Sequence, residues 1–316
     1  MTWDVQGKMV KYQEPKKRLP ADNPLTGVVM EPEDYSTNRY YYQNEKYGIW
    51  LYQANSLEMM DLIISTYPSG RFDMIFADPP YFLSNGGITC HAGKMVKVDK
   101  GDWDVSRGAE INHEFNQAWI SRCQRLLNPN GTLWVTGTHH VIFSVGYAMQ
   151  QLGMKILNDI AWEKPNPPPN LSCRYFTHST ETVIWAAKDG KSKHLFNYDL
   201  MRAANKGKQM KTVWSVPAPS ADEKTSGKHP AQKPVALVER CLLASTNEGQ
   251  LVLDPFNGSG TTGIACLRRR RNYVGIEMST EYLDLSVKRI AAEIDKMENG
   301  PLTCPNHSTA SKKQPE

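Results

Sequence analysis

The chain alternates between short runs of apolar residues and longer segments in which apolar residues recur every three or four positions. The run FDMIFA at 72–77 is apolar almost throughout, which is typical of a strand buried on both faces of a sheet. Such strands, alternating with helices of about 10–15 residues, predict βαβ units and a mostly parallel sheet. The pattern predicts strands at 48–53, 72–77, 132–137, 250–256 and 272–277, and helices at 56–65, 113–127, 141–152, 234–245, from about 260, and at 281–297.

The middle and the ends of the chain depart from this alternation. The segments 155–164 and 181–188 resemble an antiparallel pair of strands, and the residues at 189–228 are mostly polar. The first 46 residues are polar and rich in tyrosine, which predicts an arm that packs on the main body or meets nucleic acid or a partner subunit. We therefore divide the chain into an arm at 1–46, two halves of one α/β domain at 47–163 and 229–298, an inserted region at 164–228 that includes one strand of the core sheet, and a disordered tail at 299–316.

Composition and charge narrow the class of protein only modestly. The formal net charge is +4, which permits a nucleic-acid partner without indicating one. The 6 cysteines form no CxxC pair and are too sparse for a disulfide scaffold, which argues against a zinc ribbon. The N-terminus lacks the apolar core of a signal peptide, and no stretch approaches the roughly 20 apolar residues of a membrane span. These features predict a soluble cytoplasmic protein with no membrane partner.

The first motif that carries chemistry is Asp78-Pro79-Pro80-Tyr81, directly after the strand at 72–77. Ligands of parallel sheets bind beyond the carboxyl ends of the strands. The two prolines fix the backbone and supply carbonyl oxygens without competing N–H donors, while Asp78 adds a carboxylate and Tyr81 a flat ring. This arrangement suits a planar group that bears an NH₂, such as the exocyclic amine of an extruded nucleobase. The alternative is a rigid strand-to-loop turn with a buried tyrosine.

The second motif, DPFNGSGTTG at 254–263, again follows an apolar strand. Gly258, Gly260 and Gly263 match GxGxxG, and Glu277 ends the next strand about 20 residues later, where a carboxylate can bind ribose hydroxyls. This fingerprint alone does not separate a dinucleotide from another adenosine-bearing cofactor. Too few residues follow Gly263 to supply the remaining strands, so they must come from earlier in the chain. The order of the fold is therefore expected to be circularly permuted.

In this order, the two motifs resemble the amino-group DNA methyltransferases of the β arrangement, in which the catalytic motif precedes the cofactor loop. The segments FADPPYFLSNGGIT, KMVKVDKGDWD, NPPPNLSCRYFTHSTET and KHPAQKP are similar to those of the DpnA-type adenine-N6 methyltransferases. The similarity covers about residues 48–295. It implies a Rossmann-like, circularly permuted fold that depends on S-adenosylmethionine. In it, 47–163 is the catalytic half, 164–228 holds the target-recognition region and 229–298 is the cofactor-binding half.

The resemblance also assigns roles to the motif residues. Asp78 and the carbonyl of Pro79 would accept the two hydrogens of adenine N6, with Pro80 and Tyr81 completing the catalytic motif and Tyr81 stacking on the extruded base. For the cofactor, Phe256 would pack on its adenine, Glu277 would accept from its ribose and Lys233 would meet its methionine end. The full set of expected cofactor-binding residues is Asn55, Asp78, Lys233, Asp254, Phe256, Asn257, Gly258, Ser259, Gly260, Thr261, Thr262 and Glu277.

The expected substrate is double-stranded DNA, with single-stranded DNA as a second candidate. The similarity favours GATC as the target, with GANTC and longer sites as alternatives. A homodimer, a cognate restriction endonuclease and association with the nucleoid through DNA are further expectations. No metal is expected, because His139, His140 and His178 lack metal-ligand spacing. Cations of the glycine-rich loop at 82–103 and of the inserted region are candidate phosphate contacts, although each is also compatible with an ordinary surface charge: Lys94, Lys97, Lys100, Arg174, Lys206, Lys208 and Lys211.

Three other functions stay open at this stage. Cytosine-N4 transfer uses the same kind of exocyclic amine, but Asp78 at the first motif position favours adenine, since N4 enzymes more often carry serine there. A nicotinamide oxidoreductase is suggested by the GxGxxG spacing alone. A catalytically silent DNA-binding module would not need both motifs intact. The chain has no Pro-Cys pair of the kind that C5-cytosine enzymes use as nucleophile.

Overall fold

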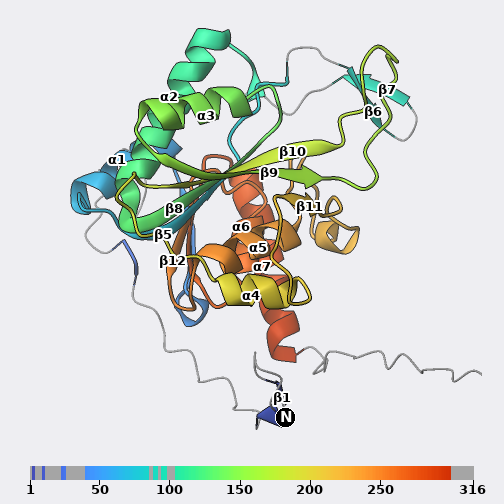
Figure 1. Cartoon of the computed structure of the whole chain (residues 1–316). Helices are drawn as coiled ribbons and strands as arrows, with labels where there is room; N and C mark the ends of the chain where they lie inside the picture. Colours follow the sequence, from blue (N-terminus) through green and yellow to red (C-terminus); the bar gives the residue numbers. More distant parts are fainter. Residues whose placement is uncertain are drawn as a thin grey trace, which may run out of the picture.

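The computed structural model describes residues 23–25, 40–84 and 104–299, together with the backbone of short strands at 2–3, 9–10, 88–91 and 94–97. The described residues form a 9-stranded mixed sheet with helices on both faces (Figure 1). In spatial order, its strands are β11 (Val213–Ser215), β9 (Lys155–Glu163), β10 (Thr180–Ala187), β8 (Leu127–Gly137), β5 (Phe72–Ala77), β12 (Leu251–Asp254), β13 (Asn272–Glu277), β4 (Ile49–Gln53) and β3 (Tyr42–Asn44).

The adjacent strands β8, β5, β12, β13 and β4 all run parallel. Their apolar runs are buried because helices cover both faces of the sheet, as the sequence pattern predicts. The C-terminal strands β12 and β13 lie between β5 and β4, which come from the N-terminal part of the chain. The predicted α/β fold with permuted strand order is therefore confirmed.

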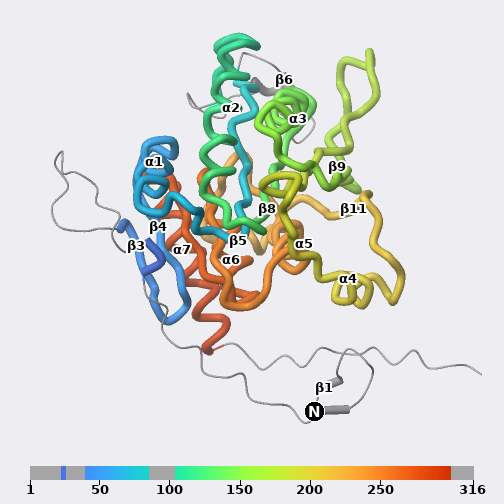
Figure 2. Tube along the Cα trace, turned by 60° about the vertical axis from the view of Figure 1, so that its left-hand side comes forward, coloured from blue at the N-terminus to red at the C-terminus, as the bar shows by residue number. Residues whose placement is uncertain are grey.

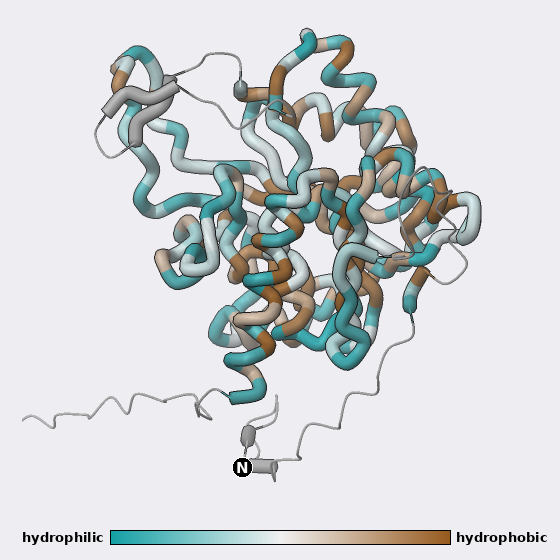
Figure 3. Tube along the Cα trace, turned by 180° about the vertical axis from the view of Figure 1, so that it is seen from behind, coloured by the Kyte–Doolittle hydropathy of each residue, from teal (hydrophilic) through white to brown (hydrophobic). Residues whose placement is uncertain are grey.

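Two groups of helices bury separate apolar clusters against the two faces of the sheet (Figures 1 and 2). The long loops at the periphery are mostly hydrophilic (Figure 3). On one face lie α1 (Ser56–Thr66), α2 (Ala109–Leu126) and α3 (Ile142–Gln151), and on the other α4 (Tyr198–Ala204), α5 (Val235–Ser245), α6 (Thr261–Arg268) and α7 (Thr280–Asn299).

The sheet becomes antiparallel at β10, which pairs antiparallel with both β8 and β9. This agrees with the antiparallel pair expected at 155–164 and 181–188. The polar stretch 189–228 contains a helix, α4, and a strand, β11, that the sequence pattern does not reveal. The strand β11 is short and adds to the sheet edge in parallel with β9, and Trp214 at its centre is buried. One buried residue in a short polar segment gives too weak a periodic signal to predict a strand.

The region expected to be an arm, 1–46, contributes to the body at two described places. Tyr42–Asn44 forms β3, which pairs antiparallel with β4 at the sheet edge. The carbonyl of Pro24 accepts a hydrogen bond from Arg71 Nε at 2.8 Å, and Leu25 is buried. The tail beyond 299 lies outside the described residues. Within the described part of the chain, we find no helix with the length and apolarity that a bilayer crossing requires.

Candidate active site

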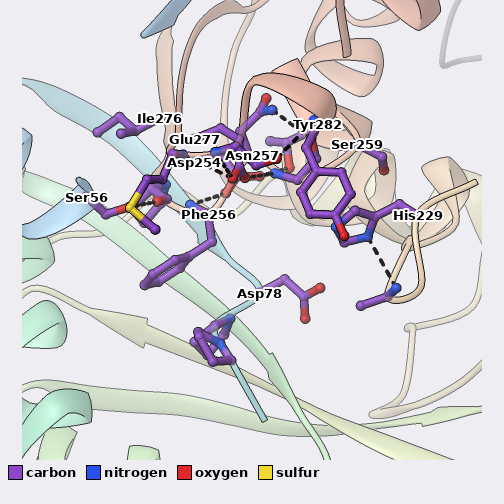
Figure 4. A pocket seen from close by; sticks show the side chains of 18 of the residues that line it. Ser56, Asp78, His229, Asp254, Phe256, Asn257, Ser259, Ile276, Glu277 and Tyr282 are labelled. Carbon is purple, nitrogen blue, oxygen red and sulfur yellow. Dashed lines mark hydrogen bonds between the residues drawn. The ribbon is translucent and has the colours of Figure 1, made fainter. Parts of the chain in front are cut away.

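The two motifs meet at one edge of the sheet because β5 and β12 are adjacent and parallel. A cavity of about 410 Å³ opens beyond these strand ends, with Asp78 on one side and Asn257, Glu277 and Tyr282 on the other (Figure 4). Of the predicted catalytic and cofactor-binding residues, only Gly260 does not line this cavity. Those that line it are Asn55, Asp78, Pro79, Pro80, Tyr81, Lys233, Asp254, Phe256, Asn257, Gly258, Ser259, Thr261, Thr262 and Glu277.

The glycine turn between β12 and α6 adopts left-handed backbone conformations, with φ of 49° at Gly258 and 73° at Gly260. A Cβ atom at Gly260 would lie 2.9 Å from Cβ of Ser286 on α7, so no larger residue fits without displacing the turn. Arg289, which is buried, donates from one guanidinium nitrogen to Ser259 Oγ at 2.9 Å and to Thr261 Oγ1 at 3.1 Å. The turn is therefore held in place by the helix behind it.

Two carboxylates connect this turn to the strand ends. Asp254 accepts from the Phe256 N–H at 3.0 Å and from Thr262 Oγ1 at 2.6 Å, and burial raises its pKa to about 7. Glu277 accepts from the Gly258 N–H at 2.8 Å. Burial raises the pKa of Glu277, although its backbone hydrogen bonds oppose the effect. Both carboxylates thus hold the turn through hydrogen bonds, and both also line the cavity.

Asp78 is the centre of a polar cluster at the end of β5. Its Oδ1 accepts from Tyr81 Oη at 2.8 Å and from Thr136 Oγ1 at 2.7 Å, and its Oδ2 accepts from Lys233 Nζ at 2.6 Å. Burial by itself would lower the pKa of Lys233, but the charges of Asp78 and Glu181 and the Asp78 hydrogen bond outweigh it and raise the pKa. The cluster therefore pairs an ammonium with the catalytic-motif carboxylate inside the cavity.

Tyr81 has a second contact that the sequence did not indicate. Its hydroxyl lies 3.2 Å from Glu181 Oε2 on β10, and Glu181 in turn forms an ion pair with Lys164 at the end of β9. Burial, followed by the charges of Asp78 and Glu181, raises the pKa of Tyr81 well above its usual value. The phenol is consequently a neutral donor at all ordinary pH values. The ring itself is buried, with Lys233 Nζ 5.1 Å from its centroid.

Asp104 is a site residue that sequence reasoning missed. It is fully buried, and its carboxylate accepts from the backbone N–H groups of Tyr81, Phe82 and Leu83 at 2.7–3.0 Å. Phe82 has a φ of 58°, which a non-glycine residue adopts only when its surroundings impose it. Asp104 therefore fixes the turn that follows the catalytic motif. The available signal was the GDWD segment, whose role is visible only once the loop is folded.

The remaining wall of the cavity is aromatic and apolar. The ring of Phe256 meets that of Trp119 edge-on at 5.5 Å between centroids, and Ser56 Oγ donates to the carbonyl of Pro255. Asn55 caps α1, with its Oδ1 accepting from the Leu57 N–H at 2.9 Å. Other lining residues that were not predicted include Phe115, His229, Gln232, Ile276, Met278 and Tyr282.

Comparison with known proteins decides the family. Residues 72–288 match the N6/N4 family model described as DNA methylase. The chain belongs to the N6/N4 DNA methylase family. It is 58% identical over 222 residues to the Type II methyltransferase M2.DpnII of Streptococcus pneumoniae, covering 70% of this chain and 83% of that protein. It is 52% identical over 255 residues to M2.LlaDCHI of Lactococcus lactis subsp. cremoris, covering 80% and 92%. The solved M1.HpyAVI–SAM complex has 31% sequence identity and a TM-score of 0.59, covering 77% of this chain and 98% of that chain.

The protein is therefore a DNA methyltransferase, and S-adenosylmethionine is its methyl donor. The predicted family, fold and enzyme class are confirmed, and membership of this family excludes the nicotinamide oxidoreductase. The residues of the cavity fit the cofactor chemically. The left-handed turn leaves the backbone open to close approach, Glu277 offers a carboxylate for hydroxyl groups, Phe256 and Ile276 offer apolar surface, and Lys233 offers a cation for a carboxylate.

The candidate DNA contacts are dispersed. Arg174 is exposed on the loop between β9 and β10. The exposed Lys206 and Lys208 follow α4, which is anchored through Asn197 to the carbonyl of Ala244, at the end of α5 remote from Lys233. Lys211 is exposed ahead of β11. Lys94 and Lys97 belong to β7, whose side chains are not described, and Lys100 lies outside the described residues.

Proposed function

We propose that this enzyme methylates N6 of adenine in duplex DNA, with GATC as the first target to be tested. The observation that carries the proposal is that the Asp78 carboxylate and the Gly258 turn line the same cavity, so one space can hold both reactants. The similarity to M2.DpnII and to the DpnA-type enzymes supports the target. Single-stranded DNA is a second candidate substrate.

The residues of the cavity suggest how the base is handled. The lone pair of adenine N6 is delocalised into the ring, so N6 is a poor nucleophile until its hydrogens are accepted elsewhere. Asp78 and the carbonyl of Pro79 are proposed as the two acceptors. The methyl group is supplied by the bound S-adenosylmethionine, and alignment of the two reactants contributes much of the rate. Pro80 holds the turn, and Tyr81 orients Asp78 as well as presenting its ring to the base.

The cofactor-binding roles are proposed for the predicted set that lines the cavity. Phe256 packs on the adenine of the cofactor, and Glu277 accepts from its ribose. Lys233, now bonded to Asp78, is placed to meet the carboxylate at the methionine end. Asn55 and the turn from Asp254 to Thr262 complete the site, with Gly260 contributing its backbone conformation.

For DNA binding, the loop between β9 and β10 is the best-supported candidate. It extends from the strand ends that adjoin the cavity, because Glu181 at the start of β10 contacts Tyr81. It exposes Phe176 and Tyr175 beside Arg174, and exposed aromatics with a cation suit stacked bases and phosphates. Lys94, Lys97, Lys100, Lys206, Lys208 and Lys211 stay weaker candidates.

The test is transfer of tritiated methyl to duplexes with and without GATC, followed by separation of the nucleosides. We expect label in N6-methyladenine from the GATC duplex and none from a scrambled duplex. Label in N4-methylcytosine would establish cytosine-N4 transfer instead. Label only in duplexes that contain GANTC would show that GANTC, and not GATC, is the target. The Asp78→Ala variant should abolish transfer while largely retaining cofactor binding in calorimetry. Full activity in that variant would refute the role of Asp78.

The resemblance to the DpnA-type enzymes also supports two partners, a second copy of the chain and a cognate endonuclease. A homodimer predicts twice the monomer mass in light scattering. A cognate restriction endonuclease predicts that extracts of the source cells cleave unmethylated DNA at the target and leave DNA methylated by this enzyme intact. Because its substrate is DNA, we expect the protein in the cytoplasm, associated with the nucleoid.

A further inference from the structure

A chain of hydrogen bonds leads from the catalytic motif toward solvent. It starts at Asp78 Oδ1, passes through Tyr81 Oη at 2.8 Å and continues to Glu181 Oε2 at 3.2 Å. The other oxygen of Glu181 is bonded to Lys164. The side chains of Asp78 and Glu181 are 16% and 10% exposed, whereas that of Lys164 is 27% exposed. The path thus runs from a carboxylate that lines the cavity, through a less exposed carboxylate on β10, to a partly exposed cation.

Hydrogen counting shows that this chain has room for one more proton. Tyr81 carries a single hydroxyl hydrogen and contacts two carboxylates, so it can donate to only one of them at a time. With both acids ionised, one of the two contacts is oxygen to oxygen with no proton between. A proton added at either carboxylate completes the chain, with each oxygen pair then sharing one hydrogen. The arrangement is therefore suited to take up one proton.

Methylation of an amine releases one proton. The N6 lone pair forms the new bond to the methyl carbon, while sulfur keeps the electrons of the carbon–sulfur bond that breaks. Nitrogen then carries a positive charge until one of its hydrogens leaves. We propose that this proton passes to Asp78 and is relayed through Tyr81 to Glu181, from which it is lost to water beside Lys164. This inference rests on the proposed role of Asp78.

The contacts around the path hold its groups in place. Lys233 contacts Oδ2 of Asp78, and Thr136 donates to Oδ1, so both keep this carboxylate oriented toward Tyr81. As a proton moves from Tyr81 to Glu181, the hydroxyl of Tyr81 receives one from Asp78, and the phenol stays neutral overall. The ammonium of Lys164 forms an ion pair with Glu181, so a cation faces the point at which the proton leaves the path. Glu181 thus acts on the base through Tyr81 and Asp78.

The experiment compares wild type with Glu181→Gln in single turnovers, with enzyme and cofactor in excess over a labelled duplex. The amide keeps the size of the side chain and can still accept from Tyr81, but it cannot take up a proton. We expect the rate of methyl transfer at neutral pH to fall by at least about 10-fold. We also expect the rate of the variant to rise steeply with pH where wild type has levelled off, since hydroxide then removes the proton. The solvent deuterium isotope effect should be larger in the variant.

The matched control is Glu239→Gln, because Glu239 is also a partly buried acid in an ion pair, with Arg269 at 3.2 Å, but does not line the cavity. It should behave as wild type. Cofactor affinity from calorimetry and target-base extrusion from 2-aminopurine fluorescence should be unchanged in Glu181→Gln. A wild-type rate, or a lowered rate with an unchanged pH profile and isotope effect, overturns the relay.

A second variant tests the path if Glu181→Gln does not fold. Lys164→Gln removes the ammonium that is paired with Glu181. Because a carboxylate ionises less readily when a neighbouring positive charge is removed, the rising limb of the pH–rate profile should move to higher pH. An unmoved limb overturns the relay. Because N6-methyladenine formation by wild type is measured separately, failure of the relay is distinguishable from failure of the proposed function.

Discussion

Residues 229–298, here called the cofactor-side half, and the inserted region at 164–228 differ in how far their polar and apolar side chains are buried within the protein. In the cofactor-side half, buried Arg271 donates to the carbonyl of Thr246 at 2.6 Å, and buried Asn257 bonds to Ser286 and Tyr273. In the inserted region, Phe176 is 96% exposed and Tyr175 is 61% exposed. The first region therefore engages these buried polar groups within the protein, whereas the second leaves two aromatic rings exposed to solvent.

The arginines of the two regions show the same difference. Arg268 pairs with Glu293 at 2.6 Å and Arg269 with Glu239 at 3.2 Å, on helices that flank the cofactor turn. Arg174 forms no ion pair within the part of the chain that the structure describes. Arg268 and Arg269 are therefore paired within the protein, while Arg174 in the inserted region is the better candidate for phosphate.

The largest expected difference between the two regions comes from a matched pair of glycine substitutions. Gly260→Ala places a methyl group 2.9 Å from Ser286 at a φ of 73°, so we expect a loss of about 3 kcal/mol and greatly weakened cofactor binding. Gly207→Ala, after α4, has a φ of 77° but no atom within 4 Å, so it should cost only about 1 kcal/mol. Urea unfolding and calorimetry measure both. Equal losses would contradict the idea that the cofactor turn is the rigid region.

The second prediction concerns pH. The pKa of Asp254 is raised from 3.8 to about 7 in the folded protein, so the native state holds a proton that the unfolded state releases. The associated stability is present below pH 4 and is lost as pH rises to about 7. Relative to Asp254→Asn, wild type should lose on the order of 4 kcal/mol over this range in urea unfolding. The exposed Asp199→Asn, in α4, is the control for loss of a carboxylate. A constant difference between wild type and Asp254→Asn would contradict the prediction.

The third prediction tests the inserted region. Phe176→Ala removes an exposed ring, so the free energy of unfolding and cofactor affinity should stay unchanged. DNA affinity should fall about 10-fold, the loss of one stacking contact, in a fluorescence anisotropy titration. Val213→Ala, at 65% exposure on β11, is the control and should bind DNA normally. A destabilised Phe176→Ala would mean that the ring packs on the protein itself.

The smallest expected effect belongs to Arg174→Ala. Losing one phosphate contact should lower the slope of log affinity against log salt by about one. Arg270→Ala is the control, since Arg270 is exposed but lies 3.5 Å from Glu248, and its slope should match wild type. Equal slopes for wild type, Arg174→Ala and Arg270→Ala would show that Arg174 does not contact a phosphate.

The strands and helices of the α/β core were predictable because each carries a strong periodic signal over its own residues. The strand at 72–77 and the helix before it need no distant partner to be recognised. The short α4 and β11 were not predictable, because few of their residues are buried and their neighbours in space are remote in sequence. The motifs at 78–81 and 254–263 were found for the same reason as the core, since each is continuous in the chain.

The sequence by itself determined the local chemistry: a carboxylate before two prolines, a glycine turn after a strand, and an acid at the end of the next strand. Only the tertiary structure decided that Asp104 fixes the turn after the Asp78–Tyr81 motif and that Glu181 and Lys164 extend the contacts of Asp78 through Tyr81. These partners lie on β10, directly after β9, or in a distant loop. Hydrogen bonds depend on distances of about 3 Å, and for residues far apart in the chain such distances arise only when the sheet assembles.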